Sequence, residues 1–215
     1  MTLKMIEAFR NLRNKNGDNV RTVAVSKRST NEEIMNVYNL NQKDFGENRV
    51  QDLVAKYNKL PKDINWHMIG HLQRNKVRDI IGFIHLIHSV DSFRLLDQIN
   101  NESTKKNLKT DVLIQVKISK DVSKYGFSAY ELDDVFKNYL SNKYRNVNIL
   151  GLMGMATFTE NISQIESEFS FLSVLYKKYS KITKLKYLSM GMSGDYLSAL
   201  KYNSNMIRLG SAIFK

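Results

Sequence analysis

Short apolar runs alternate along this chain with segments in which apolar residues recur every three or four positions. The first run, residues 23–25, is Val-Ala-Val, and consecutive apolar residues of this kind are typical of a strand buried on both faces of a parallel sheet. Thr30 and Glu33 follow with the spacing of a capping box, which predicts a helix that begins near Asn31. The first predicted unit is therefore a strand, a short loop and a helix.

This unit recurs along the rest of the chain. Further strands are predicted at residues 44–48, 66–70, 83–90, 112–116, 147–153, 187–190 and 206–209. Helices are predicted between them, with N-caps that include Asp91 or Ser92, Ser128 and Ser163, and an amphipathic helix is predicted over residues 1–14. Strands that alternate this steadily with helices favour a parallel sheet covered by helices.

We therefore predict an α/β fold: one (β/α)8 TIM-type barrel with an extra N-terminal helix, formed by residues 1–215 as a single domain. A doubly wound sheet is the alternative. That fold would carry a Gly-rich dinucleotide-binding loop after its first strand, and no such loop follows residue 25. No linker or shift in composition indicates a second domain.

Composition narrows the classes of function. No apolar run approaches the roughly 20 residues that cross a membrane, the N-terminal residues include charges where a signal peptide is apolar, and the chain has no cysteine. We expect a cytoplasmic protein with no membrane partner. The net charge of +12 would suit a nucleic acid, but the basic residues are scattered, so we predict no nucleic-acid partner. A small anionic ligand fits the same charge.

Polar residues follow several predicted strands, and a barrel gathers such residues on one face because all of its strands end there. Lys27 follows the first strand, and Arg208 lies within the last, where a buried guanidinium needs an anion or another acceptor. Residues 191–194 and 210–211, Gly-Met-Ser-Gly and Gly-Ser, occupy the loops after strands seven and eight, where barrels often bind phosphate. Taken alone, the lysine could be solvated and the glycines could simply turn the chain. Together they predict an anion site.

Four histidines lie between residues 67 and 88. His67 and His71 have a spacing that would bind a metal ion from one face of a helix, but this segment is predicted to be a strand and a turn. No cysteine or carboxylate cluster in the sequence completes a site. We therefore predict no metal.

A lysine at a strand end, a phosphate-binding loop and an arginine together suggest pyridoxal 5'-phosphate (PLP), a form of vitamin B6. This cofactor needs a lysine for a Schiff base, an anchor for its phosphate and a partner for its ring nitrogen. An arginine as that partner disfavours a protonated pyridine, because two positive charges would then face each other. We expect a cofactor held in this way to stabilise carbanions poorly.

Longer motifs point in the same direction. They are Val-Ala-Val-Ser-Lys at 23–27, Phe-Gly-Glu-Asn at 45–48, Trp-His-Met-Ile-Gly-His-Leu-Gln-Arg-Asn-Lys at 66–76, His-Ser-Val-Asp-Ser at 88–92, Leu-Ser-Met-Gly-Met-Ser at 188–193 and Ile-Arg-Leu-Gly-Ser-Ala-Ile-Phe at 207–214. In this order the motifs resemble the pyridoxal phosphate homeostasis protein family, over residues 20–214. That family shares its barrel, PLP fold type III, with the N-terminal domain of bacterial alanine racemase.

The resemblance implies cofactor-binding roles for six residues. Lys27 would be the Schiff-base lysine, Arg208 would contact the pyridine nitrogen, and Asn48 would lie near the cofactor ring. The phosphate contacts would be Ser193, Gly210 and Ser211.

The sequence departs from the family pattern at three places. Ser211 stands where threonine is common, which keeps the hydroxyl group, and Lys117 stands where asparagine is common after the fifth strand. Residues 154–158 do not follow the usual family wording, so we assign no ligands within them.

The resemblance implies a monomeric PLP carrier without catalytic residues, which holds PLP as a Schiff base on Lys27 and supplies it to recipient PLP-dependent enzymes. The first rival is an amino-acid racemase, which needs a second acid or base on the opposite face of the carbanion. Alanine racemase takes that tyrosine from a β-domain across a dimer, and we expect no such domain here. The second rival is a Schiff-base aldolase or phosphosugar enzyme on the same barrel, which would hold no coenzyme.

Overall fold

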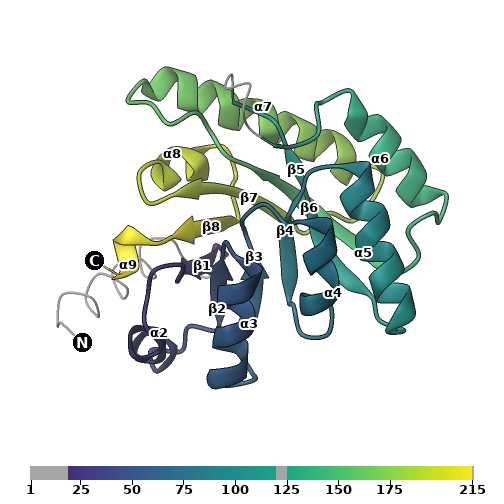
Figure 1. The fold of residues 1–215 in the computed structure, drawn as a ribbon. Coiled ribbons are helices and arrows are strands. Elements are labelled where there is room, and N and C mark those ends of the chain that lie inside the picture. The colour runs from purple at the N-terminus through teal and green to yellow at the C-terminus, as the bar shows by residue number, and fades with distance from the viewer. Residues whose placement is uncertain (1–18, 120–124, 215) are drawn as a thin grey trace.

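A closed barrel of eight parallel strands forms the centre of the molecule (Figure 1). The computed structural model describes residues 19–119 and 125–214, and the helix predicted over residues 1–14 lies outside them. Neighbouring strands follow the order of the chain, and β8 closes the barrel against β1. The strands are β1 (Arg21–Val25), β2 (Asp44–Glu47), β3 (Asn65–Met68), β4 (Leu86–Val90), β5 (Thr110–Val116), β6 (Val147–Gly154), β7 (Tyr187–Met192) and β8 (Met206–Leu209). The predicted barrel is confirmed.

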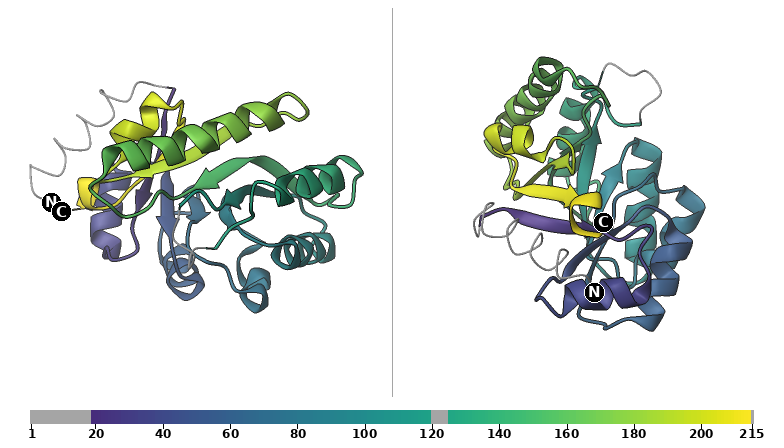
Figure 2. Two further views of the ribbon diagram at one scale, coloured as in Figure 1. Left: turned by 90° about the horizontal axis from the view of Figure 1, so that it is seen from above. Right: turned by 90° about the vertical axis from the view of Figure 1, so that its left-hand side faces the viewer.

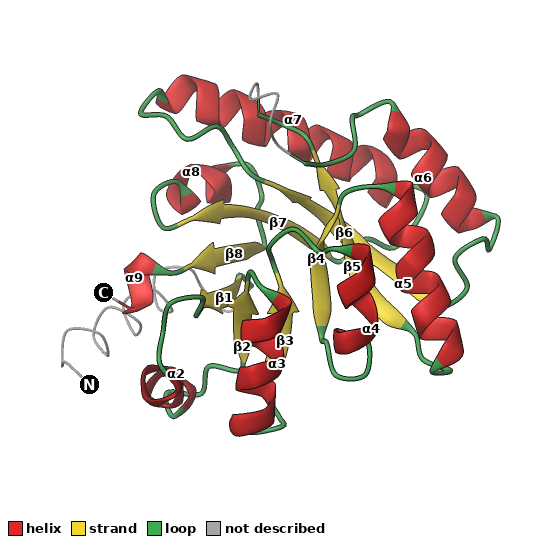
Figure 3. Ribbon diagram, viewed as in Figure 1, coloured by secondary structure: helices red, strands yellow, loops and turns green. Residues whose placement is uncertain are grey.

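Helices surround the strands on the outside of the barrel (Figure 3), and two further directions of view show the same arrangement (Figure 2). They are α2 (Asn31–Tyr38), α3 (Val50–Lys59), η1 (Arg74–Lys76), α4 (Val77–Ile80), α5 (Phe93–Lys105), α6 (Glu131–Leu140), α7 (Ile162–Ser180), α8 (Tyr196–Lys201) and α9 (Ser211–Phe214). Within the described ranges, none of these helices has the length and apolar character needed to span a bilayer.

Several predicted helix starts are confirmed by their hydrogen bonds. Thr30 and Glu33 form a complete capping box at α2, in which each side chain accepts a hydrogen bond from the other residue's backbone N–H. Ser92 caps α5 through the backbone N–H of Leu95. Helix caps of this kind can be predicted from sequence because the capping residue and its hydrogen-bond partner lie within one turn of the helix.

Several predicted boundaries are wrong. β3 ends at Met68 rather than at residue 70, β5 begins at Thr110 rather than at residue 112, and β7 ends at Met192 rather than at residue 190. The fourth strand begins at Leu86 rather than at residue 83, because the carbonyl of Ile80 accepts from the N–H groups of Phe83 and Ile84 and holds that segment in a turn. At α7 the N-cap is Asn161, whose side chain accepts from Gln164, and not Ser163. Ser163 therefore lies inside the first turn of α7.

The barrel interior and the layer between strands and helices form separate apolar cores. The interior core contains residues from strands only: Val23, Leu86, Leu113, Met153, Tyr187 and Met206. Ala24, the next residue along β1, packs instead with Ile34 and Val37 of α2. Because a large buried apolar side chain contributes roughly 1.5–3 kcal/mol, this alternation determines which strand residues face the interior.

Candidate functional site

Lys27 is exposed in the turn that follows β1, as the sequence predicted for a strand-end lysine. The residue before it, Ser26, is buried and held at three points. Its N–H donates to the carbonyl of Gly46 at 3.0 Å, its hydroxyl donates to Glu47 at 2.5 Å, and its carbonyl accepts from Lys56 at 2.7 Å. The lysine is therefore an exposed amine on a backbone segment that is firmly anchored.

Glu47 and Lys56 form the charged part of this anchor. Nζ of Lys56 lies 2.8 Å from Oε1 of Glu47, whose side chain is fully buried. The other carboxylate oxygen of Glu47 has no hydrogen-bond partner among the residues that the structure describes. A buried carboxylate is costly unless it is paired. The pair thus ties α3, β2 and the turn of Lys27 together, a role that the sequence analysis did not foresee.

Asn48 lies directly after β2 and is exposed. Gly70, after β3, packs so closely against it that an added Cβ would lie 2.3 Å from the carbonyl oxygen of Asn48 and 2.7 Å from its Cα. Strand register also brings Asn48 near Lys27, because Val25 of β1 pairs with Gly46 of β2. Both predicted residues therefore lie at the same end of adjacent strands.

Ser193 and Gly210 meet at the predicted phosphate loops. Oγ of Ser193 accepts from the backbone N–H of Gly210 at 3.2 Å and from that of Ala212 at 3.3 Å. Two amides thus converge on one oxygen atom, which is the arrangement that binds an anion through backbone groups. Ser211, between these amides, is exposed, so its hydroxyl is available at the same loop.

Gly191, next to the last residue of β7, shapes the entry to the loop that holds Ser193. Its φ of +96° is one that side chains with a Cβ rarely adopt, and an added Cβ would lie 2.7 Å from the Cβ of Ala199 in α8. At Gly194, in contrast, a Cβ would meet nothing within 4 Å. The backbone is therefore tightly packed at Gly191, before Ser193, and has open space at Gly194, directly after it.

Arg208 points into the barrel interior, two residues after Met206 of the interior core, and is 4% exposed. Its guanidinium donates to Oγ of Ser189 at 2.6 Å and to the carbonyl of Gly154 at 3.0 Å. Burial lowers the pKa of Arg208 to about 10, against the opposing charge of Asp195, so the side chain stays positive near neutral pH. Three of its five N–H groups remain for a ligand.

The sequence analysis missed the partners of Arg208. Gly154 lies in the segment to which no ligands were assigned, and its contribution is a backbone carbonyl, which no side-chain pattern reveals. Ser189 could have been found, because it is a polar residue within the apolar strand β7, two positions from Tyr187 of the interior core. Lys117 is exposed after β5.

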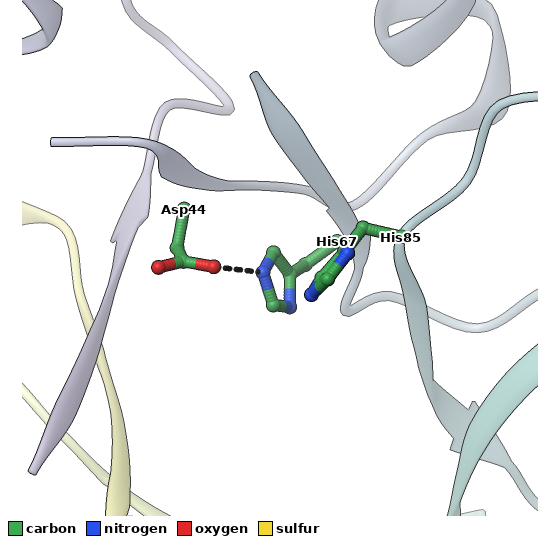
Figure 4. Close-up of side chains that lie close together, drawn as sticks. All are labelled: Asp44, His67 and His85. Carbon is green, nitrogen blue, oxygen red and sulfur yellow. Dashed lines mark hydrogen bonds and ion pairs between the residues drawn. The ribbon is translucent and has the colours of Figure 1, made fainter. Parts of the chain in front are cut away.

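The histidines lie in two different environments. His71 is on the loop after β3, where Nδ1 lies 2.8 Å from Asp91, whereas His67 is buried in β3 with Nε2 3.0 Å from Asp44. Asp44, His67 and His85 offer atoms within 4.8 Å of one another (Figure 4). The guanidinium of Arg21 lies 3.7 Å from Asp44 and 3.5 Å from His85, so its charge would repel a metal ion there.

A groove of about 600 Å³ opens between the loops after β3 and β4, at the same end of the barrel. It is lined by His71, Leu72, Gln73, Arg74, Asn75, Asp91, Ser92, Arg94, Leu95 and Gln98. None of the six predicted cofactor residues lines this groove. The candidate site, formed by the lysine and the converging donors, therefore lies outside this groove.

Comparison with known proteins identifies the family. The alanine racemase N-terminal domain family matches residues 4–215. The pyridoxal phosphate homeostasis protein of Aquifex aeolicus is 36% identical over 204 residues, which cover 92% of this chain and 88% of the relative. The chain belongs to the pyridoxal phosphate homeostasis protein family. The resemblance stated from the motifs is thereby confirmed.

Solved structures related to this family share its barrel. PipY of Synechococcus elongatus PCC7942, solved with PLP bound, superposes with a TM-score of 0.88 at 29% identity, covering 98% of this chain and all (100%) of PipY. An alanine racemase of Clostridium difficile superposes with a TM-score of 0.77 at 15% identity, and the match covers 56% of that enzyme. At that identity, the second likeness shows the shared barrel alone.

Proposed function

We propose that this protein binds PLP at the end of the barrel where Lys27, Asn48, Arg208 and the loops after β7 and β8 lie, and that it serves in PLP homeostasis. One observation carries the proposal: the backbone N–H groups of Gly210 and Ala212 both donate to Oγ of Ser193. These groups follow β8, which pairs with β1, the strand before Lys27. PLP bound to PipY and the names of the relatives support the proposal.

The residues present fit this cofactor. Bound there, PLP would supply an aldehyde that forms a Schiff base with a lysine amine. Lys27 offers that amine from an anchored turn. Gly210 directly follows the adjacent strand β8, and a Cβ added to it would lie 3.5 Å from the carbonyl oxygen of Val25. Ser193, Gly210 and Ser211 would hold the phosphate, and Asn48 would lie beside the ring.

Arg208 would set the reactivity of the bound cofactor. Its buried, positively charged guanidinium donates hydrogen bonds and accepts none, so a ring nitrogen facing it would accept one and stay unprotonated. This supports a carrier over an amino-acid racemase. Rapid exchange of the α-proton of alanine in deuterated water, with racemised product, would favour the racemase instead.

Delivery of PLP to recipient enzymes, action as a monomer and a cytoplasmic location belong to the same proposal. A transfer assay tests the first of these. Loaded protein mixed with a PLP-dependent enzyme stripped of its cofactor should restore that enzyme's activity, even when alkaline phosphatase is added to destroy free PLP. Restoration that disappears with the phosphatase would contradict direct delivery.

Titration with two forms of the vitamin tests the binding site. PLP should bind at least about tenfold more tightly than pyridoxal, because charge-assisted hydrogen bonds to the phosphate exceed neutral ones in strength. Ser193→Ala should reduce this preference, whereas Ser141→Ala, at the exposed end of α6, should not. Equal affinities for PLP and pyridoxal in the parent protein would contradict the proposed phosphate loops.

A further inference from the structure

A chain of hydrogen bonds crosses the inside of the barrel from Arg208 toward the end where the strands begin. Nη1 of Arg208 lies 2.6 Å from Oγ of Ser189, which lies 3.1 Å from Nδ1 of His88. Nε2 of His88 lies 2.9 Å from Nδ1 of His67, and Nε2 of His67 lies 3.0 Å from Asp44. The five residues come from β8, β7, β4, β3 and β2 in turn.

Both ends of this chain have fixed hydrogen-bonding roles. A guanidinium only donates, so Ser189 accepts from Arg208, and an ionised carboxylate only accepts, so His67 donates to Asp44. Burial raises the pKa of Asp44, but the hydrogen bond from His67 and the charge of Arg21 outweigh it and keep the pKa below 3.8. Asp44 is therefore the terminal acceptor at neutral pH.

The two histidines in the middle are neutral. Burial lowers the pKa of His67 despite Asp44, and it lowers the pKa of His88 well below 6.5, with His67 and Arg208 adding repulsion. Arg21 also lies near His67, and its positive charge opposes a proton there. A neutral imidazole carries one donor and one acceptor, so each histidine must use one nitrogen for each role.

These conditions leave one pattern of donors. Because His67 donates through Nε2, its Nδ1 accepts from Nε2 of His88, and Nδ1 of His88 then accepts from the hydroxyl of Ser189. Every hydrogen bond thus runs in one direction, from Arg208 to Asp44. Aligned hydrogen bonds polarise one another, so each acceptor is strengthened by the next member of the chain.

We propose that Ser189, His88, His67 and Asp44 position Arg208 from inside the barrel, and that the orientation of the guanidinium at the cofactor ring depends on this chain. The functional part rests on the proposed function. Among the described residues, the acceptors that hold the guanidinium of Arg208 are the hydroxyl of Ser189 and the carbonyl of Gly154, so the orientation of that hydroxyl bears directly on the guanidinium. The sequence alone gave no sign of this link, because its members are up to 164 positions apart.

Nuclear magnetic resonance of protein labelled with 15N-histidine tests the pattern without any cofactor. His67 and His88 should both be neutral, with the proton on Nε2, at pH 7. A proton on Nδ1 of either ring, or a positively charged imidazole at either position, would overturn the proposed direction.

Two variants at His88 show whether its hydrogen bonds position Arg208 or whether its side chain only fills space. Glutamine can place one acceptor and one donor where the imidazole has them, whereas leucine fills the space without either. His88→Leu should weaken PLP binding by about tenfold or more and shift the absorption maximum of the bound cofactor, because Ser189 loses its acceptor. His88→Gln should retain the parent spectrum and bind PLP within about threefold of the parent.

Ser103→Ala is the matched control. It removes a buried hydroxyl that bonds to Thr110 at 2.6 Å and belongs to none of the hydrogen bonds between Arg208 and Asp44, so it should leave the PLP spectrum unchanged despite a loss of stability. Equal effects of His88→Leu and His88→Gln on the spectrum would overturn the positioning role. If the parent protein failed to bind PLP, the proposed function would be refuted instead. The histidine tautomers would still show whether the hydrogen bonds from Arg208 to Asp44 run in the proposed direction.

Discussion

At the scale of single residues, the exposed Lys27 depends on buried charges that lie behind it. Ser26 contacts both Glu47 and Lys56, so the backbone before Lys27 is bonded to β2 and α3 at once. A reactive amine needs this restraint, because a displacement of about 1 Å at a binding group can cost much of its effect.

Replacing Lys56 by methionine should show how much this anchor contributes. The change keeps an unbranched side chain, one atom shorter, but leaves the buried carboxylate of Glu47 without its cation, which should lower the free energy of unfolding by about 3–5 kcal/mol. Urea denaturation measures this loss. The matched control is Lys43→Met, whose ion pair with Asp63 is exposed and should have no resolvable effect. Equal losses in the two variants would contradict the role of Glu47 as a buried anchor.

Part of the site could be predicted from residue types in the sequence. Lys27 and Arg208 stand out because each is a charged residue at or in an apolar strand. Glu47 and Lys56 do not stand out, because a glutamate at a strand end and a lysine on a helix are usually solvated. Their pairing depends on how α3 packs against β2 and β3, which is a tertiary contact that no local pattern records.

At the scale of elements, close contacts between strand ends determine where the site residues lie. Gly70 allows the loop after β3 to rest directly on the backbone of Asn48, and Gly191 allows the end of β7 to approach α8 closely. Both contacts involve backbone atoms, which cannot rotate away as the end of a flexible side chain can.

Gly70→Ala should displace Asn48. The new methyl group would lie within 2.8 Å of three atoms of that residue, and overpacking of this kind costs about 1–3 kcal/mol of stability. PLP binding should weaken as well, because Asn48 is proposed to lie beside the ring. Thermal unfolding and PLP titration provide the two readouts.

Gly194→Ala is the control for this prediction, since a Cβ there meets nothing within 4 Å. It should change neither stability nor binding beyond the error of measurement. A Gly70→Ala protein that matches the parent in both properties would show that the contact with Asn48 is not required.

Helices and strands were easier to predict from the sequence than the residues at which they begin and end. The apolar runs located all eight strands because burial on both faces leaves an unbroken hydrophobic signal. The start of β4 was misplaced because Phe83 and Ile84 are as apolar as strand residues, yet hydrogen bonds to the carbonyl of Ile80 hold both of them in a turn. At α7 three candidate caps, Thr159, Asn161 and Ser163, follow one another, and local composition does not choose among them.

At the scale of the whole molecule, hydrogen-bonded polar residues cross an otherwise apolar barrel interior. Because two of these residues are buried histidines, the stability of the protein depends on pH. His67 and His88 are held neutral because burial lowers their pKa values, whereas both protonate near pH 6.5 once the protein unfolds. The unfolded state therefore binds more protons below pH 6.5, and the folded protein loses stability there.

Denaturation between pH 8 and pH 5 should reveal this dependence. The free energy of unfolding should be level above pH 7 and should fall below pH 6.5 by up to about 1.4 kcal/mol per pH unit for each buried histidine. His88→Gln should reduce the slope because glutamine does not titrate. His71→Gln, at an exposed position, should keep the steep decline from the buried histidines. An unchanged slope in His88→Gln would mean that this residue is already protonated in the folded protein.

The central claim is that Lys27 carries the cofactor, and peptide mass spectrometry after borohydride reduction tests it most directly. Protein loaded with PLP should be yellow, should lose that colour on reduction, and should carry the reduced adduct on the peptide that contains Lys27. Lys27→Ala should bind PLP more weakly and form no adduct at this position. An adduct found mainly on another lysine, or no adduct in the loaded parent, would contradict the assignment of Lys27.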